Sequence, residues 1–116
     1  MAAITPTITE PRANYDDTYR FFWEQINQDD TGASVAVPTP VRHGTVVFQG
    51  TFDGGTYTLE GSLDGGTTFI TLKDVAGNAI SATANAIFEF KTNARHIQIG
   101  QSGGTAEDVD VYVDIY

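Results

Sequence analysis

The clearest signal along the chain is an alternation of hydrophobic and polar positions with a period of two. Near the C-terminus, four aliphatic residues (Val109, Val111, Val113 and Ile115) alternate with Asp110, Tyr112, Asp114 and Tyr116. The segments Thr45–Phe52 and Thr56–Leu63 alternate in the same way. Successive side chains of a strand point to opposite faces, so this pattern predicts antiparallel strands with one buried and one solvated face.

Glycine-rich turns separate these segments. They are Asp53-Gly54-Gly55, Asp64-Gly65-Gly66 and Ser102-Gly103-Gly104, and all contain residues that tolerate positive φ. Further strands are predicted over Ala33–Val37, Thr67–Leu72, Ala86–Lys91 and Arg95–Gln101. With turns this frequent, we expect hairpins between successive strands and no long helix. The predicted fold class is all-β: an antiparallel β-sandwich, jelly-roll or immunoglobulin-like.

The N-terminal part of the chain differs from the rest. Residues 1–14 contain Pro6 and Pro11, which disfavour both a helix and a central strand, so an extended N-terminal arm is expected there. Residues 15–116 are expected to form a single sandwich domain. The aromatic segment Tyr15–Ile26 opens that domain; a strand is favoured over a short helix, with Tyr19, Phe21 and Trp23 on one face.

Composition narrows the classes of partner. The 116 residues carry 15 acidic and 6 basic side chains, a formal net charge of −9, and the basic residues form no run. Nucleic-acid affinity depends on Lys and Arg contacts to phosphates, so we expect no nucleic-acid partner. No segment approaches the roughly 20 apolar residues of a membrane span, so no membrane partner is expected. The N-terminus lacks a signal-peptide pattern, which favours synthesis in a cytoplasm.

Candidate catalytic chemistry is sparse. The chain has no cysteine, its two histidines (His43 and His96) show no metal-ligand spacing, and no Gly-x-Ser-x-Gly motif is present. The turn residues Asp53, Asp64, Asp74 and Asn78 could be imagined as calcium ligands, but turn formation explains them better. We therefore expect no catalytic residues, no metal site, no cofactor and no enzymatic activity.

One turn carries a known motif. Residues 62–69, from Ser62 to Phe69, have the form Ser-x-Asp-x-Gly-x-x-aromatic. This resembles the Asp-box of sialidases and other β proteins, with Phe69 where tryptophan is usual. The resemblance implies a hairpin whose Asp64 carboxylate caps the backbone while the aromatic ring packs beneath it.

A wider resemblance covers most of the chain after residue 18. Its elements are residues 46–52, 59–69, 72–80 and 102–105, preceded by Trp23-Glu24 and Asp30-Thr31-Gly32. Together they resemble small all-β virion structural proteins of tailed phages. The resemblance implies a capsid decoration (cement) protein that binds the outer surface of the capsid and stabilises it. The resemblance implies two kinds of partner: the major capsid protein, and further copies of this chain in a homo-oligomer such as a trimer. A surface this acidic would repel packaged DNA, which favours the capsid exterior.

For such a role, the candidate assembly interface comprises six apolar residues: Ile4, Pro6, Ile8, Tyr19, Phe21 and Trp23. The arm could lie across a neighbouring subunit, and aromatic side chains are enriched in interfaces. A disordered N-terminus is the alternative for the arm, and core packing is the alternative for some of the rings. Two other functions remain open: a tail, neck or fibre structural protein, and a carbohydrate-binding β-sandwich that aids host attachment.

Overall fold

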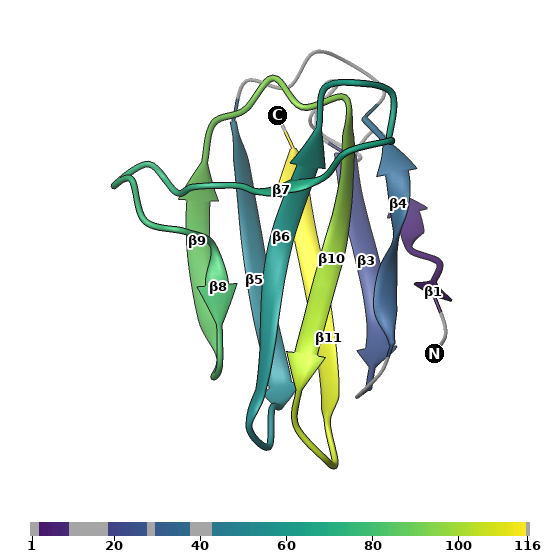
Figure 1. Ribbon diagram of the computed structural model, residues 1–116, viewed down its shortest axis with the longest axis vertical. Helices are drawn as coiled ribbons and strands as arrows, with labels where there is room; N and C mark the ends of the chain where they lie inside the picture. The colour runs from purple at the N-terminus through teal and green to yellow at the C-terminus, as the bar shows by residue number, and fades with distance from the viewer. Residues whose placement is uncertain (1–2, 10–18, 28–29, 38–42, 116) are drawn as a thin grey trace.

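The chain folds as two β-sheets packed face to face. The computed structural model describes residues 3–9, 19–27, 30–37 and 43–115, and within these ranges it contains strands and turns but no helix. The sandwich measures 39 × 28 × 26 Å, with the strands running along its length (Figure 1). The predicted all-β class and the sandwich architecture are confirmed.

Each sheet contains long central strands and short edge strands. The first, the β6 sheet, has the order β1 (Ala3–Ile4), β4 (Thr31–Ala36), β10 (His96–Gly103), β6 (Gly55–Ser62) and β7 (Ile70–Thr71), with β8 (Ser81–Ala82) also paired to β6. The second, the β11 sheet, has the order β2 (Thr7–Thr9), β3 (Tyr19–Ile26), β11 (Asp108–Ile115), β5 (Gly44–Thr51) and β9 (Ala86–Phe90). The β6 sheet lies in front of the β11 sheet in Figure 1.

The strand pairing has the topology of a jelly roll. Four antiparallel pairs, β3 with β11, β4 with β10, β5 with β9 and β6 with β8, make up one long ribbon. The ribbon is wound so that its successive pairs lie alternately in the two sheets. Two four-stranded sheets connected in this way form a jelly roll, which separates this fold from the immunoglobulin-like alternative.

The predicted succession of hairpins is wrong at two of the glycine-rich turns. The turn at Asp53–Gly55 joins β5 to β6, and the turn after Gly103 joins β10 to β11, yet the strands of each pair lie in different sheets. A glycine corner allows a sharp reversal but does not select the partner strand. Since each flanking strand has an apolar face, stacking the two strands across the sandwich buries both faces. The predicted strand Thr67–Leu72 is also shorter than expected, because only Ile70–Thr71 pairs, with β6.

The core follows the alternation of the sequence. On β11 the four aliphatic side chains from Val109 to Ile115 are at most 1% exposed, as predicted. The two large polar-tipped rings of the core have their polar atoms satisfied: Trp23 Nε1 donates to the Ala33 carbonyl (3.1 Å) and the Tyr57 hydroxyl donates to the Ile26 carbonyl (2.7 Å). Burying these rings therefore leaves neither polar tip without a partner.

The two glycine-rich turns that do not form hairpins, at Asp53–Gly55 and after Gly103, contact each other at one end of the sandwich. Asp53 Oδ2 accepts hydrogen bonds from the Thr105 hydroxyl (2.6 Å) and the Ala106 amide (3.0 Å), which ties the β5–β6 corner to the β10–β11 corner. Beneath them, Glu107 is only 4% exposed and accepts a hydrogen bond from Gln101 Nε2 (2.9 Å). A Cβ atom at Gly55 would overlap the Glu107 carboxylate, so glycine is required there by space.

Candidate assembly interface

The N-terminal segment lies on the edges of its own domain. Over the described residues 3–9, β1 pairs in parallel with β4, and β2 pairs antiparallel with β3, so each sheet gains one edge strand. Ile4 is half-buried against the core, Pro6 is half-buried, and Ile8 is 42% exposed. Of the three predicted interface residues of the arm, Ile8 therefore presents the most side chain to solvent. A contact of this segment with a partner stays a prediction.

Residues 19–26 of the aromatic segment form strand β3 with the predicted orientation, but the inward rings of this strand belong to the core; residues 15–18 lie outside the described residues. Phe21 and Trp23 are 0% exposed, and Tyr19 is partly buried and packs against the core. Phe21 and Trp23 thus offer no surface to a partner. Among the described rings of this segment, Phe22 faces outward, and the predicted interface omits it.

Strand register brings four apolar side chains into one line across the outer face of the β11 sheet. Phe22 on β3 lies opposite Tyr112 on β11, Tyr112 lies opposite Val47 on β5, and Val47 lies opposite Ile87 on β9. The Phe22 and Tyr112 rings are stacked, with centroids 4.4 Å apart and planes 7° apart. Ile87 is 67% exposed. We call these four residues the apolar row.

Polar and charged residues border the apolar row. On one side, Arg20 makes a two-pronged ion pair with Asp114, at 2.7 Å from Nε and 2.9 Å from the terminal nitrogen. The hydrogen bond to Asp114 is the main cause that raises the pKa of Arg20 above its ordinary value. On the other side, the Asp110 carboxylate accepts a hydrogen bond from the backbone amide of Gln25 (2.9 Å). Gln25 has a φ of 57°, at a bulge in β3.

A hollow opens in this face beside the row. It has a volume of about 280 Å³ and is lined by Tyr112 and Val47 of the row together with Arg20, Asp114, Thr45 and Gln49. Its lining combines an aromatic ring, an aliphatic side chain and an ion pair. Such a lining suits a partner side chain with an apolar stem and a polar end.

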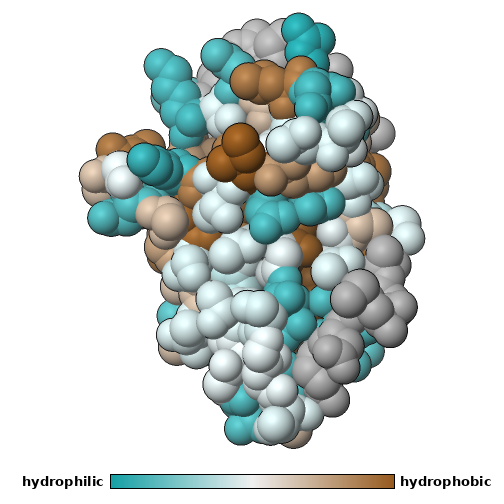
Figure 2. Space-filling view, in the orientation of Figure 1, coloured by the Kyte–Doolittle hydropathy of each residue, from teal (hydrophilic) through white to brown (hydrophobic). Residues whose placement is uncertain are grey.

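The opposite outer face, on the β6 sheet, is polar. A shallow groove of about 420 Å³ there is lined mainly by Thr, Gln, Ser and Gly residues of β6 and β10. At its centre Glu60 accepts hydrogen bonds from Gln98 Nε2 (2.7 Å) and from the Thr58 hydroxyl (3.3 Å). Pale and hydrophilic surface covers the lower part of this face in Figure 2. None of the described residues that line the groove is aromatic, so these residues provide no ring on which a sugar could stack.

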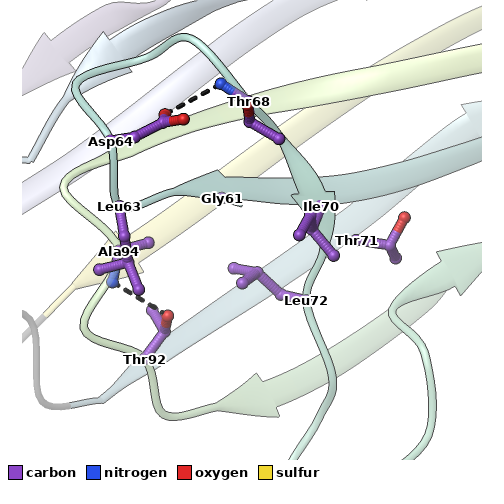
Figure 3. A pocket seen from close by; sticks show the side chains of 9 residues that line it. All are labelled: Gly61, Leu63, Asp64, Thr68, Ile70, Thr71, Leu72, Thr92 and Ala94. Atoms are coloured by element: carbon purple, nitrogen blue, oxygen red, sulfur yellow. Dashed lines mark hydrogen bonds between the residues drawn. The ribbon is translucent and has the colours of Figure 1, made fainter.

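A second apolar surface lies at the upper end of the β6 sheet, where hydrophobic surface gathers in Figure 2. Leu63 and Ile70, 72% and 69% exposed, border a pocket of about 360 Å³ with Leu72 and Ala94 behind them (Figure 3). Gly61 also lines this pocket, and a Cβ atom there would come within 3 Å of both Leu72 and Ala94. The glycine therefore keeps the pocket open.

The turn beside this pocket is fixed by Asp64. Its Oδ1 accepts hydrogen bonds from the Ser62 hydroxyl (2.7 Å) and from the backbone amide of Thr67 (3.1 Å). It also accepts one from the backbone amide of Thr68 (2.9 Å), which is drawn in Figure 3. These donors, the Ser62 hydroxyl first, lower the pKa of the Asp64 carboxyl well below its usual range. Phe69 is half-buried and is not among the side chains that pack against the core. The Asp64 carboxylate thus stabilises the turn by accepting hydrogen bonds from its backbone amides.

The remaining candidate chemistry is dispersed. Within the part of the chain that the structure describes, no three His, Cys, Asp or Glu side chains come together as metal ligands would. His43 is exposed, and His96 is half-buried on the β6 sheet. In the same ranges, no helix has the length and apolar character needed to cross a membrane. The expected absence of catalysis stays a prediction.

Comparison with known proteins supports the fold. No known protein family and no curated protein sequence matches the chain. Among solved structures, the chain is similar to the SPBc2 prophage-derived protein YomS, with a TM-score of 0.63 and 13% identity over 96% of this chain and 95% of YomS. It is also similar to the PBSX exported protein XepA, with a TM-score of 0.64 and 17% identity over 92% of this chain. That match covers 41% of XepA, so the chain spans less than half of XepA's length. At these identities the likeness shows a shared fold.

Proposed function

We propose that this protein is a structural, non-catalytic component of a phage particle, and specifically a capsid decoration protein that binds and stabilises the outer surface of the capsid. One structural neighbour, the SPBc2 protein YomS, is prophage-derived, and it matches over nearly the whole of both chains. This origin supports a phage role. The proposed position on the capsid rests in addition on the physical properties of the protein surface.

The observation that carries the proposal is the exposed apolar surface on an otherwise acidic protein. The apolar row and the Leu63–Ile70 pocket leave large aliphatic side chains about 70% exposed, while the chain carries a formal net charge of −9. Contiguous apolar surface is unfavourable in water, and on a folded protein it marks a site where another molecule binds. A protein–protein contact removes this surface from water.

The charge of the protein supports the outer side of a capsid over the inner side. The capsid interior holds packaged DNA, whose phosphates would repel a protein with this net charge. The same charge keeps the free protein soluble before it binds to the outer surface. A lattice of identical capsid sites would also allow modest affinity at each contact to add up, if the copies of this protein are linked to one another.

The test is the number of copies in purified particles of the phage that encodes the chain, measured by quantitative mass spectrometry against the major capsid protein. A decoration protein would be present at a copy number on the order of hundreds, set by the capsid lattice. A copy number of about a dozen would favour a ring at the neck or tail instead. Absence of the protein from purified particles would refute the proposal.

A further inference from the structure

We infer that the outer face of the β11 sheet is the surface through which this protein docks, and that its partner presents an apolar ridge bordered by Lys and Arg side chains. The inference rests on the proposed function, because it takes the partner to be a protein of the phage particle. It goes further by naming one face of the sandwich and the chemistry that this face recognises.

The geometry of the apolar row supports a protein as the partner. Its four side chains lie on four neighbouring strands, β3, β11, β5 and β9, and are in register. With strands about 4.8 Å apart, the row extends over about 14 Å. That length suits a partner strand or helix laid across the sheet. The hollow beside Tyr112 and Val47 has room for a side chain of that partner.

The row is also fixed in position. The stacked rings of Phe22 and Tyr112 support each other, and the Arg20 guanidinium lies 5.7 Å from the centre of the Tyr112 ring. Arg20 is itself held by its two hydrogen bonds to Asp114. Side chains that are ordered before binding lose less conformational entropy when a partner arrives. The side chains of this face are therefore preorganised for binding.

Charge selects the kind of partner. The outward positions around the row carry four carboxylates, on Glu24, Asp110, Asp114 and Glu89, and Asp114 is already paired with Arg20. Beyond the end of β9, Lys91 adds one further cation. Carboxylates exceed cations, and the whole chain is acidic as well. A partner with Lys and Arg beside its apolar ridge would be complementary to this border.

The same charges argue against a second copy of this chain on this face. Two such faces laid together would bring their bordering carboxylates close to one another, and each copy has a net charge of −9. Like charges across an interface are unfavourable. The apolar row by itself could pair with another apolar row, but its acidic border opposes that pairing.

The experiment uses two variants of the full chain, Ile87→Asp and Ser34→Asp. Ile87 belongs to the row, whereas Ser34 lies on β4 in the opposite sheet. Both side chains are exposed, so the two substitutions place the same charge at solvated sites on the two different sheets. Each purified variant is added to particles from a phage in which the gene has been deleted, and binding is measured by co-sedimentation.

We expect Ile87→Asp to weaken binding about tenfold or more, and Ser34→Asp to bind as the wild type does. We also expect Glu89→Gln to reduce the sensitivity of binding to added salt, because it removes one carboxylate that would pair with the partner's cations. Equal unfolding midpoints of all variants, followed by the fluorescence of the buried Trp23, would show that the fold is retained.

The outcomes separate the inference from the proposed function. If the wild type binds particles and Ile87→Asp binds equally well, the docking face is wrong and the proposed function stands. If the wild type does not bind particles at all, the proposed function and the inference both fail. If sedimentation of the free protein shows an oligomer that Ile87→Asp dissociates, the face binds a second copy and the inference is overturned.

Discussion

The substitution Gly55→Ala tests the packing that holds the two glycine corners together. The Cβ atom of an alanine at this position would overlap the carboxylate of Glu107, which is 4% exposed and hydrogen-bonded to Gln101. Glu107 would have to move, so that the protein gains packing strain and loses a buried hydrogen bond. Strain of about 1–3 kcal/mol and a similar loss for the hydrogen bond give a destabilisation of about 3 kcal/mol or more.

The control is Gly65→Ala. Gly65 has a φ of +83°, but the space around its Cβ position is empty, so alanine there carries only a backbone cost of about 1–2 kcal/mol. The second control is the double variant Gly55→Ala with Glu107→Ala. Once the carboxylate is absent, Gly55→Ala should cost less than it does in the wild type, by about 1–3 kcal/mol.

The assay is equilibrium unfolding in urea, followed by the fluorescence of Trp23, which is the single tryptophan and is fully buried. The free energy of unfolding of each variant gives the required differences. If Gly55→Ala is no more destabilising than Gly65→Ala, or if its cost is unchanged when Glu107 is absent, the packing argument is refuted.

Three further results are expected from single side chains. The Asp64 carboxyl should titrate below its usual range in an NMR titration, and Ser62→Ala should raise its pKa, since the Ser62 hydroxyl is the main donor; no change would contradict that role. Because folding lowers this pKa, the ionised form stabilises the fold at pH values above about 4, and that contribution is lost as the pH falls further. Replacing Arg20 by Gln should cost about 1 kcal/mol or less in urea unfolding, because the ion pair with Asp114 is solvated; a loss of several kcal/mol would contradict this. Asp53→Ala should lower the urea midpoint, since it removes both hydrogen bonds between the corners, and an unchanged midpoint would argue against that link.

The sequence predicted the strands and their buried faces well, because a half-buried strand shows its period directly. The inward positions of β11 followed from alternation. The placement of Phe21 and Trp23 on one face of their strand also followed from it, but the burial of that face did not. The outward positions of Tyr112 and Val47 also followed from it. What alternation could not supply was the neighbour of each strand.

Pairing depends on long-range contacts that no local pattern records. The corner at Asp53–Gly55 has the residues of a hairpin, yet β5 pairs with β11 and β9, which are distant in sequence. The apolar row exists only once four strands are in register, so its residues looked like isolated outward positions in the sequence. For the same reason the predicted interface chose Phe21 and Trp23 and omitted Phe22.

The most direct test of the central claim is a cryo-electron microscopy map of the phage particles that carry this protein, compared with particles from which the gene has been deleted. We expect additional density for a two-sheet sandwich on the outer surface of the capsid, with the β11 sheet turned toward the capsid. Identical capsid surfaces in the two maps, or density for this protein only inside the shell or at the tail, would contradict the claim.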